Sequence, residues 1–239
     1  MDTPQTPRIV FEDDHMLALL KPSGWITNKA STTKNQPVLQ KWIEDNLDFE
    51  ISKNEKLRSG IVHRLDKETS GIILVAKNEE IMRALQSKFK QREVKKKYTA
   101  LAHNVSAQKE GTIDAPVGRL PWRRDRFGVL PGGRSATTHF KVKHLYARKE
   151  EKFTLFELEP VTGRTHQIRI HLKYINHPIV GDHFYAGRKT ARNDRKWCPR
   201  LFLHASSIEL SHPKDDTKLK LTADLPSDLQ SCLDTLKSI

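Results

Sequence analysis

Cysteine, long apolar runs and acidic side chains are all scarce in this chain of 239 residues. The two cysteines, Cys198 and Cys232, form no CxxC pair and no metal-ligand pattern, so we expect free thiols in a reducing compartment. No apolar run approaches the roughly 20 residues that span a bilayer. The first seven residues lack the cationic and apolar segments of a secretory signal. We therefore expect a cytoplasmic protein.

Standard cofactor motifs are also missing. The sequence has no GxxxxGKS/T phosphate loop, no GxGxxG dinucleotide motif and no HExxH zinc motif. His166 and His171 stand five apart, which places them on different faces of a helix, and no cysteine or carboxylate joins them at ligand spacing. We expect neither a metal nor an organic cofactor.

The shortage of acidic residues leaves the chain strongly basic. Lys and Arg number 42 against 29 Asp and Glu, for a formal net charge of +13. Such an excess attracts polyanions, and phosphate contacts by Lys and Arg supply most non-specific affinity for nucleic acids. The plain alternative is a basic surface that binds nothing, because charge alone discriminates poorly between functions.

Apolar patterns predict more strands than helices. Strands are expected near residues 9–11, 16–20, 71–76, 94–103, 136–146, 152–160, 201–210 and 219–222. Helices are expected near 37–47, 79–89, 166–175 and 226–236, and basic loops over 117–135 and 186–200. Without regular strand–helix alternation, the pattern favours an α+β fold with a largely antiparallel sheet. We expect a disordered tail over residues 1–8 and one domain over 9–239.

The segment His63-Arg64-Leu65-Asp66-Lys67-Glu68-Thr69-Ser70-Gly71 precedes an apolar run and is the most informative stretch. Cationic neighbours such as Arg64 and Lys67 keep the carboxylate of Asp66 ionised. An ionised carboxylate at the mouth of a buried strand suits nucleophilic chemistry.

Two other clusters supply polar donors and an aromatic ring. In residues 162–171 we expect Thr165 to cap a helix from which Gln167 and Arg169 project, with one guanidinium able to pair with a carboxylate elsewhere. Tyr98 follows three lysines, as base stacking beside a phosphate backbone requires. The bland alternatives are a solvated basic helix face and an ordinary core or edge-strand tyrosine. Together with Asp66, the clusters point to chemistry on a nucleotide extruded from its stack.

These motifs resemble the RluA family of RNA pseudouridine synthases. The matching segments are His63–Asp66 with Thr69–Gly71, Lys97 and Tyr98 in KKYTA, Gly118-Arg119, Ala136 with Thr138, Thr162–His171, His177–Asp182 and Leu203–Ala205. They occur in family order from about residue 9 to 225. The resemblance implies an α+β catalytic fold, with a mixed, mainly antiparallel sheet, flanking helices and a central cleft. It implies an isomerase that needs no cofactor and modifies ribosomal or transfer RNA.

The resemblance also implies roles for individual residues. Asp66 becomes the catalytic aspartate, as a nucleophile or in a deprotonation route at C1′, while Arg169 pairs with it and Tyr98 stacks on the flipped-out uracil. Arg64 would enter the RNA helix or loop in place of the flipped nucleotide. The remaining expected RNA contacts are His63, Lys97, Arg119, Arg123, Arg124, Arg164, His166 and Gln167.

One departure from many relatives is expected. The catalytic region begins by residue 9, which leaves no room for their additional N-terminal RNA-binding domain of the S4 type. Target choice would then rest on the catalytic domain and the two basic loops. We expect a monomer without an obligatory protein partner.

Two alternatives come from other functional classes. One is a catalytically silent RNA-binding or assembly protein of the same fold, although binding alone requires no nucleophile. The other is a glycosylase that releases the base. Glycosidases normally use two carboxylates, whereas the nearest second one here, Glu68, lies in the same turn.

Overall fold

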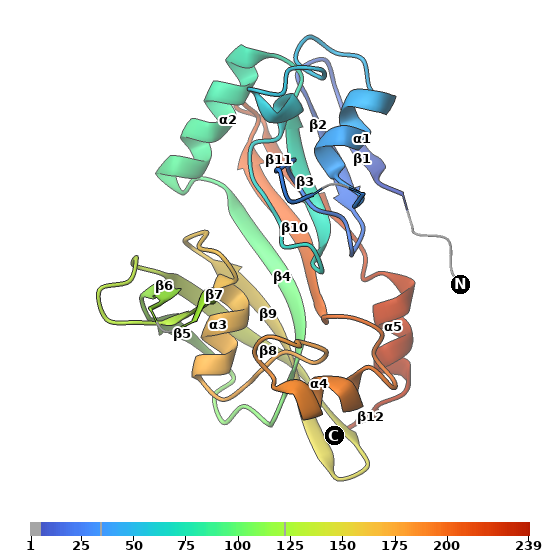
Figure 1. The fold of residues 1–239 in the computed structure, drawn as a ribbon, viewed down its shortest axis with the longest axis vertical. Coiled ribbons are helices and arrows are strands. Elements are labelled where there is room, and N and C mark those ends of the chain that lie inside the picture. Colours follow the sequence, from blue (N-terminus) through green and yellow to red (C-terminus); the bar gives the residue numbers. More distant parts are fainter. Residues whose placement is uncertain (1–5, 34, 122) are drawn as a thin grey trace. The chain divides into compact units, whose positions relative to one another are not determined.

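The computed structural model describes residues 6–33, 35–121 and 123–239, except the side chains of Arg124 and Asp125. The chain forms two compact units, one of Met1–Lys95 with Ala205–Ala223 and the other of Lys96–His204 with Asp224–Ile239 (Figure 1). Strand β1 begins at Arg8, and most of the expected tail lies outside the described residues. The expected single catalytic domain over 9–239 stays a prediction.

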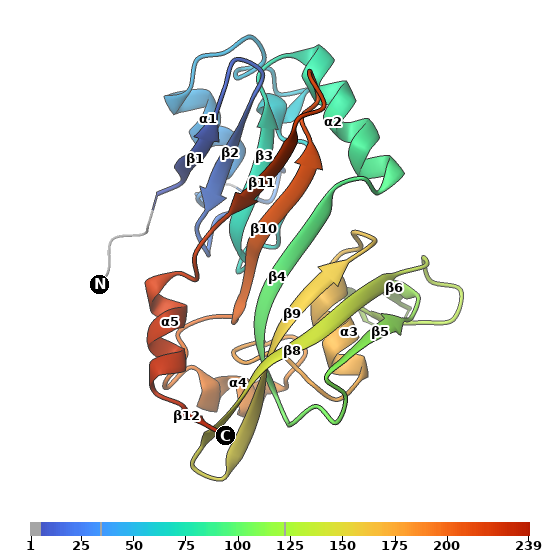
Figure 2. The same cartoon turned by 180° about the vertical axis from the view of Figure 1, so that it is seen from behind.

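The strands of the first unit follow the order β1-β2-β3-β10, with β11 paired to β10 (Figure 2). The pairs β1–β2, β2–β3 and β10–β11 are antiparallel. Its strands are β1 (Arg8–Glu12), β2 (Met16–Lys21), β3 (Ser70–Ala76), β10 (Leu203–Ser211) and β11 (Lys218–Thr222). Its helices are α1 (Leu39–Asn46), the short 3-10 helix η1 (Arg58–Gly60) and α2 (Glu79–Gln91).

Strand β3 lies at the centre of the core of this unit and is buried along its whole length. Helix α2 packs Ile81, Met82 and Leu85 into the same core, a spacing that lines one helix face. The side chain of Asn78 caps α2 by accepting a hydrogen bond from the Ile81 amide at 2.9 Å. Both elements confirm the expectation from sequence.

The second unit has strands in the order β4-β9-β8-β12, with β5 paired to β8. These strands are β4 (Lys95–His103), β5 (Glu110–Asp114), β8 (Thr137–Arg148), β9 (Glu151–Pro160) and β12 (Lys237–Ser238). Its helices are α3 (Gln167–Tyr174), α4 (Arg188–Asp194) and α5 (Ser227–Asp234). All pairings in this sheet with a defined register are antiparallel. The mixed α+β class with a mainly antiparallel sheet is confirmed.

Two expected basic loops contain regular structure, and in this respect the prediction is wrong. Residues 117–135 include a hairpin of β6 (Val117–Leu120) and β7 (Arg123–Val129). Phe127 and Val129 pack against Ile170 of α3, so this contact stabilises strands that the arginines obscured. Residues 186–200 contain α4, which the sequence signals only weakly because its one fully apolar buried residue is Ala191.

Cys198 and Cys232 are both free and buried in the core of the second unit, as expected. None of the helices in the described ranges is long and apolar enough to cross a membrane.

Candidate active site

The loop that carries Asp66 leads directly into β3. Leu65 anchors it in the core with 4% of its surface exposed. The Thr27 hydroxyl donates to the Leu65 carbonyl at 2.9 Å and accepts from the Leu65 amide at 3.2 Å. On the other side, the Thr69 amide donates to the Asp66 carbonyl at 3.1 Å. The backbone on both sides of the half-buried Asp66 is therefore fixed.

A buried lysine donates hydrogen bonds to the backbone of this loop and of the turn after β2. Lys21, at the end of β2, has no exposed surface, and its ammonium donates to the carbonyls of Pro22 and Trp25 at 2.9 Å. It also donates to the Lys67 carbonyl at 3.3 Å. Burying an ammonium is costly unless hydrogen bonds replace its water, and these carbonyls supply them.

Two further hydrogen bonds join the turn after β2, residues 21–24, to the Asp66 loop. The Ser23 hydroxyl donates to the Glu68 carbonyl and the Gly24 amide to the Lys67 carbonyl, both at 2.8 Å. The sequence Lys21-Pro22-Ser23-Gly24 has the composition of a turn. A lysine at the end of an otherwise apolar strand was the available signal for a buried support.

The Ser-Gly pair that follows Asp66 allows a close approach of two strands. Gly71 has φ +130°, and a Cβ atom there would lie 2.4 Å from the carbonyl oxygen of Ala205 in β10. That separation is far inside van der Waals contact, so only glycine fits without displacing a strand. Two sequence motifs, Thr69–Gly71 and Leu203–Ala205, thus meet at the base of the loop.

His63 contributes to this architecture. Its Nε2 accepts a hydrogen bond from the Leu74 amide of β3 at 2.9 Å, and its ring lies 4.8 Å from that of Phe89 in α2. The adjacent Arg64 is exposed. The predicted RNA contacts of both residues stay predictions.

Tyr98 and Lys97 lie near the start of β4 in the second unit. Tyr98 stands opposite Leu158 of β9 and packs, half-buried, against the core. Lys97 pairs with Glu157 at 3.3 Å. Burial lowers the pKa of the preceding Lys96, and the charge of Glu159 opposes that shift. The predicted stacking by Tyr98 and the RNA contact of Lys97 stay predictions.

Arg169 is buried rather than projecting from α3, which corrects the expectation from sequence. It is 3% exposed and forms a two-bond ion pair with Asp182, with Nε–Oδ2 at 2.8 Å and Nη2–Oδ1 at 2.9 Å. Asp182 Oδ1 also accepts from the amides of Phe184 and Tyr185. The guanidinium carbon lies 5.4 Å and 5.1 Å from those two ring centroids. The predicted pair with Asp66, which belongs to the other unit, stays a prediction.

Gln167 is also buried, at 4% exposure, because its amide connects three segments. Its oxygen accepts from the Thr162 hydroxyl at 2.7 Å and the Arg164 amide at 3.0 Å. Its nitrogen donates to the carbonyl of Thr137 and the hydroxyl of Thr138, both at 3.0 Å. The expected projection of Gln167 is therefore wrong, and its RNA contact stays a prediction.

The start of α3 also differs from the prediction. His166, in the left-handed conformation at φ 55°, occupies the cap position, and no side chain caps the helix there. Thr165 is thus not the cap. The interior of this helix is polar but satisfied: His171 pairs its two ring nitrogens with the Thr138 hydroxyl and the Ala115 carbonyl, each at 2.9 Å. Burial lowers the pKa of His171.

A mixed group of aromatic and cationic side chains surrounds the first turn of α3. His166 Nδ1 lies 2.9 Å from the Tyr185 hydroxyl, and its ring also lies near Phe127 and Phe184. Arg126 of the hairpin donates to the Phe184 carbonyl at 3.0 Å. Sequence reasoning missed the roles of Phe184 and Tyr185, although they directly follow the recognised His177–Asp182 motif.

The other predicted RNA contacts occupy the same region. Arg164 donates to the Ser135 carbonyl at 3.0 Å, Arg119 stacks 4.9 Å from the Phe127 ring, and Arg123 is exposed. The side chain of Arg124 lies outside the described part of the chain. The second unit therefore brings together His166, Arg169 and the basic hairpin.

Comparison with known proteins agrees with these motifs. A family model described as RNA pseudouridylate synthase matches residues 15–174. Ribosomal large subunit pseudouridine synthase D of Nitrosomonas europaea is 36% identical over 236 residues, which cover 97% of this chain and 66% of that protein. The chain belongs to the RluA family of RNA pseudouridine synthases. Members of this family are isomerases that convert uridine to pseudouridine in RNA.

A second relative bears the same family name, and a solved structure has the same fold. The uncharacterized RNA pseudouridine synthase YlyB of Bacillus subtilis is 35% identical over 229 residues, which cover 96% of this chain and 72% of that protein. The chain spans about two thirds of the length of its Nitrosomonas relative. The structure of human RNA pseudouridylate synthase domain containing 1 has the same fold, with a TM-score of 0.75, 23% identity and coverage of 100% of this chain and 91% of that one.

Proposed function

We propose that this protein isomerises uridines in ribosomal RNA, with Asp66 as its catalytic residue acting on a flipped-out uridine. The observation that carries the proposal is the support of the Asp66 loop by Lys21, Ser23 and Thr27 in a chain of this family. A catalytic carboxylate must be held in one geometry, because small displacements of a reacting group cost large factors in rate. An ordinary surface turn would need no buried ammonium beneath it.

The proposed reaction breaks the bond between C1′ and N1 of the uridine and forms a bond between C1′ and C5. The proton on C5 is released and N1 takes up a proton, so nothing is oxidised or hydrolysed overall. Asp66 acts either as a nucleophile at C1′ or through the deprotonation route. Tyr98 stacks on the uracil, and Arg169 pairs with Asp66 to keep it ionised.

The structure supports parts of the Arg169 assignment. A buried guanidinium held by Asp182 and stacked near two aromatic rings has a fixed position. A fixed cation lowers the pKa of a carboxylate within about 4–6 Å. Arg64 would take the place of the flipped nucleotide, as its exposure permits.

Tritium release from RNA labelled at uridine C5 tests the proposal. Wild-type protein should release tritium, and Asp66→Asn should reduce the rate by more than about 10³-fold while keeping RNA affinity, since carboxamide cannot supply the charge or the nucleophile. A wild-type protein that binds RNA but releases no tritium would instead be a silent binding protein. Free uracil with an abasic product would identify a glycosylase and contradict the proposal.

The substrate proposed is large-subunit ribosomal RNA, because several relatives carry that substrate in their names. Pseudouridine mapping in a strain that lacks the gene should reveal the missing sites. Loss confined to transfer RNA would contradict the ribosomal assignment and leave the isomerase assignment intact.

A further inference from the structure

Helix α4 and the two residues after it carry a dense group of cations. Residues 188–196 contain five, namely Arg188, Lys189, Arg192, Arg195 and Lys196, and one acid, Asp194. All five cations are exposed, whereas Asp194 is 1% exposed. The only negative charge of the segment is therefore turned inward, away from its cationic face.

The buried side of α4 is tied to the body of the second unit. Asp194 Oδ2 accepts from the Gly181 amide at 2.9 Å and lies 3.0 Å from His103 Nε2. Arg195 donates to the carbonyls of Gly181 and Pro199 at 3.1 Å and 2.8 Å. These bonds hold a helix that is too short to be stable alone. The remaining cations consequently stand on a fixed support.

Among the described residues, the outer cations of this segment have no acidic partner. Within the described ranges, no carboxylate lies within salt-bridge distance of Arg188, Lys189, Arg192 or Lys196. Three exposed cations of the first unit differ, since Lys41, Lys53 and Arg83 pair with Asp45, Asp48 and Glu79 respectively. A solvated surface helix normally carries charges of both signs. A surface with positive charge alone attracts an anionic partner.

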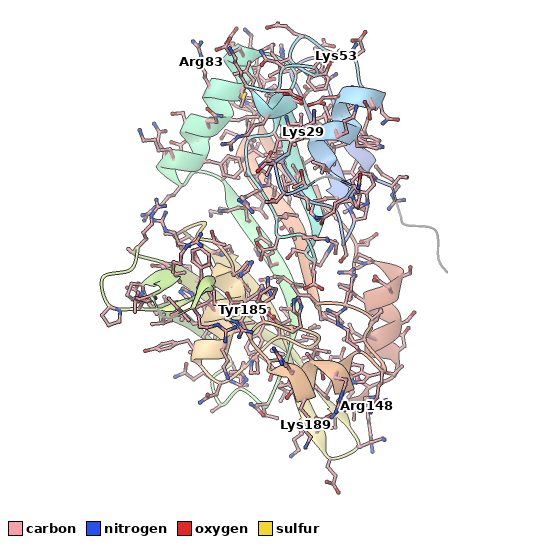
Figure 3. The ribbon with its side chains drawn as sticks, in the orientation of Figure 1. Lys29, Lys53, Arg83, Arg148, Tyr185 and Lys189 are labelled. Carbon is pink, nitrogen blue, oxygen red and sulfur yellow. The ribbon has the colours of Figure 1, made fainter. Side chains whose placement is uncertain are left out.

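A neighbouring arginine extends the basic surface beyond α4. Arg148, at the end of β8, lies 5.1 Å from the ring of Trp197, which directly follows the cationic segment. Figure 3 shows Arg148 and Lys189 at the same end of the second unit. The Trp197 ring is itself anchored on Phe153 at 5.4 Å. Arg148 therefore adds a further cation beside the cationic segment.

We propose that the outer face of α4, with Arg188, Lys189, Arg192 and Lys196, binds the sugar–phosphate backbone of the substrate RNA. The proposal rests on the proposed function, which supplies the RNA. Arg188 and Arg192 stand four residues apart, about one helical turn of 5.4 Å, and Lys196 follows directly after the helix. Such contacts fix the position of the RNA and carry no sequence information.

The test is the triple variant R188Q/K189Q/R192Q, which removes three charges from exposed side chains. We expect its affinity for a short synthetic RNA duplex to fall at least about tenfold at low salt. Each lost phosphate contact lowers the slope of log affinity against log salt concentration by about 0.7–0.9, so the slope should fall by about two.

Two matched variants complete the experiment. K41Q/K53Q/R83Q removes the same charge from cations that are paired within the first unit and should change affinity and slope little. R188K/R192K keeps the charge and should bind as wild type. Unchanged affinity and slope in the triple variant, with an unchanged melting temperature, would overturn the inference. An equal loss in K41Q/K53Q/R83Q would overturn it too, because bulk charge would then suffice. If the wild-type protein releases no tritium, only the proposed function is contradicted. The inference about α4 is still tested, because duplex binding is measured separately.

Discussion

The Asp66 loop and the Arg169 cluster hold their key residues in different ways. The loop is positioned through its backbone, because Lys21, Ser23 and Thr27 all bond to main-chain atoms of residues 65–68. Arg169 is positioned through its own side chain, by the carboxylate of Asp182. The difference implies that the side chain of Asp66 can be replaced without loosening its loop, whereas the support of Arg169 depends on charge.

Removing Asp182 should have the largest effect on stability. Asp182→Ala leaves the buried Arg169 without this counter-charge and two loop amides without their acceptor. Breaking a buried ion pair on one side costs about 3–5 kcal/mol, measurable as a loss of unfolding free energy in denaturant. Asp48→Ala, which removes a pair between exposed side chains, should cost less than about 1 kcal/mol. Similar costs for the two variants would show that the buried pair contributes no more than a surface one.

Removing Lys21 should come next. Lys21→Met keeps the volume but takes the donor away from the carbonyls of Pro22, Trp25 and Lys67. We expect a loss of about 2–3 kcal/mol, since each unsatisfied buried acceptor costs about 1–3 kcal/mol and backbone relaxation recovers part of it. Turnover should fall as well, because the backbone beside Asp66 loses its support.

Lys67→Met is the control for Lys21→Met. Lys67 is exposed, and its ammonium bonds to the Gln36 side chain rather than to the loop backbone. The unfolding free energy of the Lys67→Met variant should stay within about 0.5 kcal/mol of wild type. If Lys21→Met were as stable and active as this control, the loop would not depend on the buried ammonium.

The smallest effect is expected from pH, through His171 in the second unit. Burial lowers the pKa of this histidine, so the folded protein binds its proton less readily than the unfolded chain does. Its contribution to stability is complete above the unfolded pKa of about 6.5 and declines as the pH falls below it. His171→Gln, whose amide can both donate and accept, should flatten this decline in melts between about pH 7 and about pH 5. An identical pH profile in the variant would exclude His171 as the source.

Much of the fold was predictable because apolar periodicity reports burial directly. Strand β3 and helix α2 appeared at the expected positions. The β6–β7 hairpin and α4 were not predictable from periodicity. Arginines dominate both, and the contacts that stabilise them come from elsewhere in the chain, namely Ile170 for the hairpin and Gly181 for α4.

The candidate site was predictable only where a motif named it. The resemblance supplied the roles expected of Asp66, Tyr98 and Arg169, but no motif marked the residues that support them. Polarity suggested that Gln167 and Arg169 face solvent, but both are buried because Thr137, Thr138 and Asp182 satisfy their polar atoms. Long-range hydrogen bonds of this kind leave no periodic signal in a sequence.

The order in which the chain is synthesised gives the approach of Gly71 to Ala205 a further consequence. Strand β3 emerges early from the ribosome, but Ala205 and the core residues Ile208 and Leu210 of β10 follow only after the whole of Lys96–His204. The core of the first unit, which contains the Asp66 loop, therefore cannot be completed until β10 has been synthesised. The second unit waits longer still, since Leu229 and Leu233 of α5 complete its core. A nascent chain that ends before α5 would lack Leu229 and Leu233, so the two cores are completed one after the other, each by residues far along the chain from its first strand.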